Sequence, residues 1–129
     1  MARILLVEDY EPIRRLLTKA LELDGHTVTA RDNGTQAITV FIDNAHDLVI
    51  TDMEMPYLSG PELIAEIQQL SPTTPIIGMT CGPLPEPMEQ ERQRLNIAAM
   101  FAKPMDLGAL RQTVQKLTAK NVPLADQAA

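Results

Sequence analysis

Five short apolar runs lie along the chain and predict five β-strands. Residues 4–7 and 48–50 are continuous aliphatic stretches, which are typical of strands that a parallel sheet buries on both faces. Residues 26–30 alternate between polar and apolar side chains, and this pattern predicts a shorter strand at an edge of the sheet. The remaining runs, 75–80 and 98–102, predict two further strands.

Apolar residues recur at helical spacing in the segments between these runs. The clearest helix runs from Glu11 to Leu23, because a proline stands in its first turn and a glycine follows its end. A second helix is expected after the turn at 33–34, and a third between Gly60 and Ser71. The apolar positions that mark these three helices are Ile13, Leu16, Leu17, Ala20, Leu21, Ala37, Ile38, Phe41, Ile42, Leu63, Ile64 and Ile67.

Prolines restrict the second half of the chain. Three of them between residues 83 and 87 exclude a helix before about residue 87, so only 89–95 can be helical there. Asp106 is the expected N-cap of a last helix that ends near Leu117. No pattern continues from Asn121, so we expect one folded domain over residues 1–120 and a disordered tail over residues 121–129.

Strands that alternate with helices predict the α/β class, with a doubly wound, five-stranded parallel sheet and helices on both of its faces. The chain has 129 residues, which suits a single domain of this kind.

Charge and composition exclude several classes of partner. Seventeen acidic residues against eleven basic ones give a net charge of −6, which argues against direct nucleic-acid binding. The single cysteine, Cys81, excludes an internal disulfide and suits a reducing compartment. No signal peptide and no apolar run of membrane-spanning length is found. We therefore expect a soluble cytoplasmic protein that has no membrane partner.

Polar residues stand where four of the predicted strands end: Glu8 and Asp9, Asp52, Thr80 and Lys103. The carboxyl ends of parallel strands form the crevice in which open α/β sheets bind ligands, so these side chains are expected to meet there. A lone aspartate at a strand end usually caps a turn, but five polar residues at equivalent positions favour a functional site. Two carboxylates about 4 Å apart repel by roughly 4 kcal/mol at a surface-like dielectric, and Mg²⁺ would relieve this repulsion.

The same residues suit phosphoryl transfer. Asp52 provides a carboxylate nucleophile, Lys103 provides a fixed positive charge for the phosphoryl oxygens, and Thr80 provides a hydroxyl donor.

With these motifs in place, the chain closely resembles the receiver domain of two-component response regulators, in particular single-domain regulators of the chemotaxis type. The resemblance extends from Arg3 to about Leu117 and implies a flavodoxin-like sheet with strand order 2-1-3-4-5. Its motifs are Glu8-Asp9, Asp52 followed by Met55-Pro56 and Gly60, Thr80, and Phe101-x-Lys103-Pro104.

The resemblance implies that Asp52 is the phosphoacceptor and receives its phosphoryl group from a sensor histidine kinase or a phosphotransfer protein. It also implies that Asp9, Asp52 and the backbone carbonyl of Glu54 ligate Mg²⁺, while Glu8 acts through a bound water. Lys103 would pair with the phosphoryl group. The downstream protein target is not identified by the sequence.

The resemblance further implies a conformational switch made of Thr80 and Phe101, and a cis peptide bond before Pro104. Phe101 stands where tyrosine is more frequent, so the switch would work by packing without a phenolic hydrogen bond. Asn96 stands where glycine usually ends the fourth helix, and asparagine tolerates the left-handed conformation that such a cap needs.

Two other functions fit parts of the pattern. A phosphatase of the haloacid-dehalogenase type would use Asp52 as a transient nucleophile and Glu54 as its acid, but the chain lacks the cap domain and the rest of that signature. A flavodoxin-like nucleotide binder needs a glycine-rich loop after the first strand, where this chain carries acids. We therefore expect a signalling domain that catalyses only its own phosphotransfer and dephosphorylation. His26 and His46 are expected to be ordinary surface residues at the opposite end of the sheet.

Overall fold

The structure is a computed structural model that describes residues 2–81 and 87–119. The expected tail over 121–129 and the start of the proline-rich segment, 82–86, lie outside the described residues. The elements in chain order are β1 (Arg3–Val7), α1 (Glu11–Leu23), β2 (Thr27–Arg31), α2 (Gly34–Asp43), β3 (Leu48–Asp52), α3 (Gly60–Leu70), β4 (Ile76–Thr80), α4 (Met88–Leu95), β5 (Ala99–Ala102) and α5 (Leu107–Thr118).

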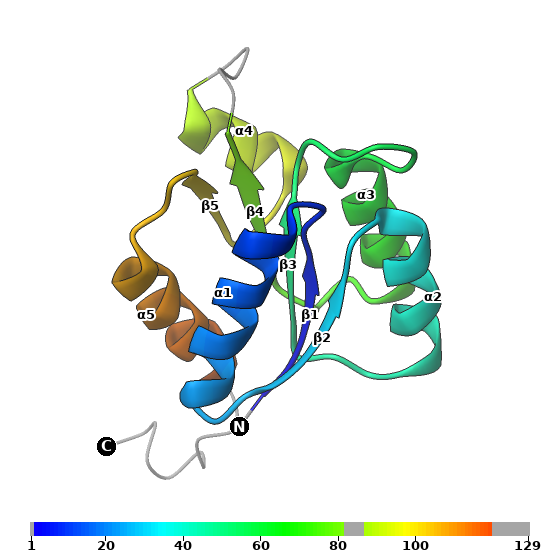
Figure 1. Ribbon diagram of the computed structural model, residues 1–129. Coiled ribbons are helices and arrows are strands. Elements are labelled where there is room, and N and C mark those ends of the chain that lie inside the picture. The colour runs from blue at the N-terminus through cyan, green and yellow to red at the C-terminus, as the bar shows by residue number, and fades with distance from the viewer. Residues whose placement is uncertain (1, 82–86, 120–129) are drawn as a thin grey trace, which may run out of the picture.

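The strands form one parallel sheet in the order β2-β1-β3-β4-β5, which confirms the predicted class and strand order. Helices α1 and α5 cover one face of the sheet, whereas α2, α3 and α4 lie on the other side (Figure 1). β2 lies at an edge and is only partly buried, as its alternating sequence predicts. Among the described residues, no helix combines the length and the apolar character needed to cross a bilayer.

The core consists of two apolar layers, one on each face of the sheet. Successive side chains of a strand point to opposite faces, so Leu6 joins the layer under α1 and α5 while Leu5 joins the layer under α2 and α3. All five residues of β3 and all five of β4 are buried. The site residues at the ends of these strands therefore stand on a rigid support.

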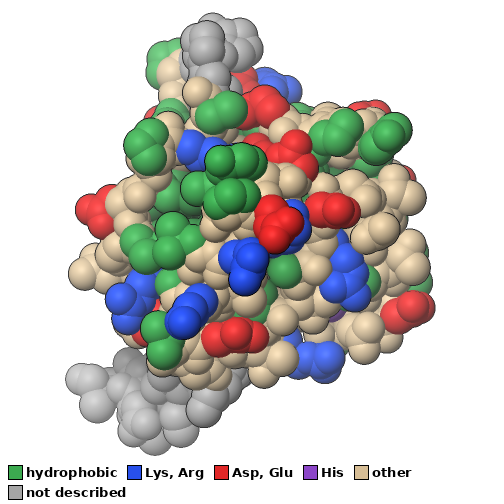
Figure 2. Space-filling view, viewed as in Figure 1, with side chains coloured by type: hydrophobic (Ala, Val, Ile, Leu, Met, Phe, Trp, Pro, Cys, Tyr) green, Lys and Arg blue, Asp and Glu red, His purple; other side chains and the backbone are tan. Residues whose placement is uncertain are grey.

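Two of the apolar residues that mark the predicted helices lie mainly outside the core. Leu16 is 52% exposed and Ile42 is 64% exposed. Each helix turns other apolar side chains toward the sheet, so Leu16 and Ile42 lie at the border of the buried face. The buried side chains are Leu17 and Leu21 in α1 and Ala37 and Phe41 in α2. Leu16 lines a groove between α1 and α5, and Figure 2 shows hydrophobic and basic side chains together on this face. The groove residues are Pro12, Arg15, Leu16, Lys19, Ala20, Leu23, Leu107 and Arg111.

Helix ends follow the local sequence. The Asp106 carboxylate accepts the amide of Ala109, as expected of the N-cap of α5. Asn96 ends α4 with φ 56° and ψ 47°, so the expected left-handed cap is confirmed. α4 begins at Met88, one residue before the predicted start and directly after Pro87.

Candidate functional site

The parallel register brings the predicted site residues to one edge of the sheet. Val7 pairs with Thr51, Asp52 with Met79, and Thr80 with Ala102, so the carboxyl ends of four strands lie level with one another. Glu8, Asp52, Thr80 and Lys103 follow or close these strands. The carboxyl ends of the strands lie at the upper end of the sheet in Figure 1.

Asp52 is held firmly at the centre of this edge. It is 2% exposed, and its Oδ1 accepts a hydrogen bond from the backbone amide of Glu54 at 3.1 Å. Its Oδ2 accepts a hydrogen bond from the ammonium of Lys103 at 3.0 Å. Gly60 lets α3 start against this loop, because a Cβ there would lie 2.5 Å from the carbonyl oxygen of Asp52. Packing and hydrogen bonds together fix the position of the carboxylate.

Three carboxylates cluster around this point. Glu8, Asp9 and Asp52 each offer an oxygen, and these oxygens all lie within 4.8 Å of one another. Oε1 of Glu8 lies 2.7 Å from the ammonium of Lys103, yet this buried oxygen accepts no hydrogen bond of good geometry from any described residue. A buried carboxylate oxygen that has only an ion pair as partner, next to an exposed carboxylate, belongs to the oxygen-rich donor set that a hard divalent cation prefers. The residues present therefore fit Mg²⁺.

The pKa values in the site reflect this crowding. Burial raises the pKa of the Asp52 carboxyl to about 7; the hydrogen bond from Lys103 acts against this shift, and the charge of Glu8 adds to it. Burial alone would lower the pKa of the Lys103 ammonium, but its close contacts with the carboxylates of Glu8 and Asp52 raise it above the ordinary value. Among the residues that the structure describes, one ammonium faces three acids here, so acidic groups outnumber it.

Thr80 and Glu54 form a contact that the sequence pattern alone does not predict. The buried hydroxyl of Thr80 donates to Oε2 of Glu54 at 2.9 Å. The next backbone amide, of Cys81, donates to Oε1 of the same carboxylate at 3.0 Å. This hydrogen-bonding carboxylate, together with burial, raises the pKa of the Cys81 thiol. The signal available in the sequence was an acid two residues beyond Asp52, opposite a hydroxyl at the end of the next strand.

The predicted switch residue Phe101 lies in β5, one strand away from Thr80 along the sheet register. It is partly buried and packs against the apolar layer under α1 and α5. The Lys103–Pro104 peptide bond is cis, which confirms the expectation from the resemblance. Thr80 thus closes β4, Phe101 lies in the neighbouring strand β5, and Lys103 directly follows β5 and reaches Asp52.

The two histidines directly precede or lie near the amino ends of strands β2 and β3, at the opposite end of the sheet from these residues. The prediction that His46 is a surface residue is wrong: it is 9% exposed and stacks on Phe41, with ring centroids 5.8 Å apart. Burial lowers the pKa of the His46 imidazole. His26 is partly buried and accepts the amide of Ala2. Both rings are therefore structural.

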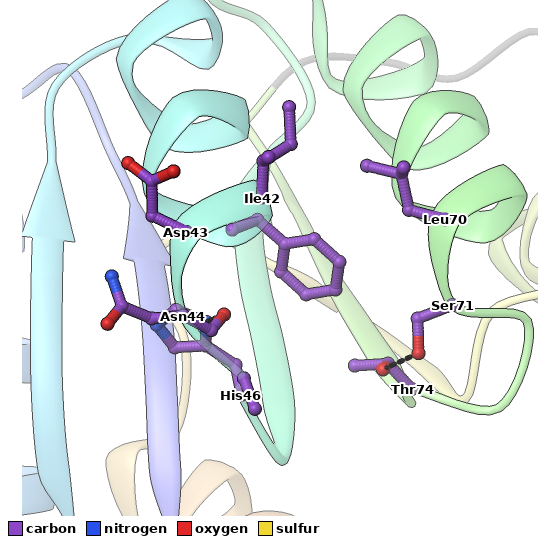
Figure 3. Close-up of a pocket in the computed structure, with 9 residues that line it drawn as sticks. Ile42, Asp43, Asn44, His46, Leu70, Ser71 and Thr74 are labelled. Carbon is purple, nitrogen blue, oxygen red and sulfur yellow. Dashed lines mark hydrogen bonds between the residues drawn. The ribbon is translucent and has the colours of Figure 1, made fainter.

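His46 also borders a hollow of about 380 Å³ between the ends of α2 and α3 (Figure 3). Phe41, Ile42 and Leu70 give it apolar walls, and the hydroxyls of Ser71 and Thr74 bond to each other at 2.6 Å. Asp43 is the one acidic residue in its lining, so the hollow lacks the cluster of carboxylates that marks the carboxyl edge.

Comparison with known proteins points in one direction. A model of the response regulator receiver domain matches residues 4–115. The chain is 33% identical over 115 residues to sporulation initiation phosphotransferase F of Bacillus subtilis, covering 88% of this chain and 91% of that protein. It is 31% identical over 127 residues to the transcriptional regulatory protein GlrR of Escherichia coli, covering 98% of this chain but only 28% of that protein.

A solved structure extends the comparison. The response regulator protein TrrA from Thermotoga maritima, solved in complex with Mg(2+)-BeF, superimposes with a TM-score of 0.80 at 32% identity, covering 91% of this chain and 99% of that chain.

Proposed function

Because the chain belongs to the family of response regulator receiver domains, we propose that it accepts a phosphoryl group on Asp52 and signals through a change of conformation. The observation that carries this proposal is the Asp52 carboxylate, which lies buried beside Lys103 at 3.0 Å and within an acidic cluster. A carboxylate so placed serves as a nucleophile toward phosphorus.

In this proposal the donor is a phosphohistidine of a sensor histidine kinase or a phosphotransfer protein. An oxygen of Asp52 forms the new bond to phosphorus while the bond from phosphorus to the histidine nitrogen breaks, and that nitrogen keeps the electron pair. Lys103 balances the charge of the incoming oxygens, and Thr80 donates its hydroxyl proton to one of them afterwards. The name of the relative from B. subtilis, a phosphotransferase of sporulation initiation, supports a donor of this class.

Asp9, Asp52 and the backbone carbonyl of Glu54 would hold Mg²⁺, and Glu8 would act through a bound water. The bound cation supplies charge neutralisation at the phosphoryl oxygens. The carboxylate geometry supports this assignment, because the acids lie close together and the one nearby ammonium cannot neutralise them all.

We also propose that the domain is not an enzyme acting on other molecules. The phosphatase alternative needs Glu54 as an acid, whereas its carboxylate already accepts hydrogen bonds from Thr80 and Cys81. The receiver unit is proposed to end near residue 120, consistent with α5 ending at Thr118.

Phosphotransfer from a panel of autophosphorylated histidine kinases tests the proposed function. The chain should take radiolabelled phosphate from at least one kinase within minutes, and Asp52→Asn should take none. Equal labelling of Asp52→Asn would overturn the assignment.

A further inference from the structure

The carboxylate of Glu54 accepts hydrogen bonds from two donors at the mouth of the site. The hydroxyl of Thr80 lies 2.9 Å from Oε2, and the amide nitrogen of Cys81 lies 3.0 Å from Oε1. The Cys81 sulfur approaches Oε1 to 3.5 Å as well. An ionised carboxylate only accepts hydrogen bonds, so Thr80 and Cys81 are the donors.

This arrangement restricts what Thr80 can do next. Its side chain is 2% exposed, and its hydroxyl carries one proton, which can be donated to one acceptor at a time. A phosphoryl oxygen on Asp52 and the carboxylate of Glu54 would therefore compete for the same proton. The amide of Cys81 likewise has one proton and is already engaged.

We propose that Glu54 is a positioning residue that holds Thr80 in the unphosphorylated arrangement and lowers the affinity of the site for a phosphoryl group. The Glu54 carboxylate is an anion that already binds the Thr80 hydroxyl and the Cys81 amide. An incoming phosphoryl group needs the same donors. This inference rests on the proposed phosphoacceptor role of Asp52. Because Glu54 is exposed, water replaces its lost partners after release, so the effect has the size of a net hydrogen bond.

Beryllofluoride titration in the presence of Mg²⁺ gives the test, since the fluoride complex stands in for the phosphoryl group. Amide NMR measures the beryllofluoride concentration at which half of the protein is bound, which is the midpoint of the titration. It is determined for the wild type, Glu54→Ala, Thr80→Ala and the double variant. Glu54→Ala should lower the midpoint by about three- to tenfold. In the Thr80→Ala background the same change should have a clearly smaller effect, because the contested hydroxyl proton is gone.

Asp32→Ala is the control for charge. This exposed acid follows β2 at the same edge of the sheet, and its carboxylate accepts a hydrogen bond from the side chain of Asn33 at 2.8 Å. It should leave the midpoint within about twofold of the wild type. The amide signal of Cys81 should also shift in free Glu54→Ala, which reports the loss of its acceptor directly.

The outcomes separate this inference from the proposed function. If Glu54→Ala binds no more tightly than the wild type, or tightens equally with and without the Thr80 hydroxyl, competition for that proton is refuted. If no variant and no wild-type protein binds beryllofluoride, the phosphoacceptor role itself falls, and the competition inference falls with it.

Discussion

Lys103 Nζ lies 3.0 Å from Oδ2 of Asp52, although the two residues are 51 positions apart in the chain. The contact exists because β3 and β5 flank β4 in the sheet and end at the same edge. A buried pair of this kind places a nucleophile and its counter-charge together before any ligand arrives. The expected consequences concern stability, metal binding and the conformational switch.

The first prediction concerns stability and pH without divalent cations. The Asp52 pKa is about 7 in the folded protein, above the ordinary aspartate value near 4, so the folded state binds more protons between these values. The contribution of this carboxyl to stability is therefore full below about pH 4 and falls as pH rises to about 7. Asp52→Asn removes the titration.

The difference in unfolding free energy between Asp52→Asn and the wild type should grow in favour of the variant by roughly 1–3 kcal/mol as the pH rises from 4 to 8. Urea unfolding in EDTA at several pH values measures this gain. A difference between the two proteins that does not change with pH would contradict the raised pKa.

The second prediction concerns the metal. Asp9 is exposed and contributes to the acidic cluster, so Asp9→Ala should weaken Mg²⁺ binding at least about tenfold while leaving the fold intact. Calorimetric titration with Mg²⁺ measures the affinity, and Asp32→Ala serves as the matched control on the neighbouring strand. Unchanged affinity in Asp9→Ala would remove this residue from the proposed ligand set.

The third prediction concerns the support of Asp52. Gly60→Ala would place a Cβ 2.5 Å from both the Asp52 carbonyl oxygen and the Met53 Cα, so the loop or α3 must shift. We expect a loss of roughly 1–3 kcal/mol in unfolding free energy. Gly108→Ala is the control, because its Cβ would meet only the Asp106 carboxylate, at 3.3 Å, and it should change stability by less than about 1 kcal/mol. Equal stability of the two variants would show that the close approach at Gly60 is readily relieved.

The fourth prediction concerns the switch. Thr80→Val keeps the shape of the side chain but removes its proton, so beryllofluoride should no longer move the amide and ring signals of Phe101 to the extent seen in the wild type. Two-dimensional NMR of both proteins at saturating beryllofluoride provides the comparison. Identical shifts at Phe101 would mean that the two residues are not coupled.

Much of the fold was predictable because it depends on local patterns. Short continuous aliphatic runs bounded by turn residues are typical of strands buried on both faces, and the residues that end such strands share one edge in a parallel sheet. Asp52, Thr80 and Lys103 are therefore brought together by topology alone.

The rest depends on contacts that spacing does not encode. Leu16 sits one position from Leu17 on the same helix, yet Leu17 is buried in the core whereas Leu16 lies in an open groove beside α5. His46 is buried because Phe41 happens to stack on it. The bond from Thr80 to Glu54 depends on a side-chain rotamer in a loop, and no periodicity reports a rotamer.

The most direct measurement is the intact mass of the wild type and of Asp52→Asn after incubation with acetyl phosphate and Mg²⁺. The wild type should gain the mass of one phosphoryl group and lose it again when the donor and the cation are removed. Asp52→Asn should gain nothing, because an amide is not a nucleophile toward phosphorus. A phosphoryl adduct on Asp52→Asn, or none on the folded wild type, would contradict the role proposed for Asp52.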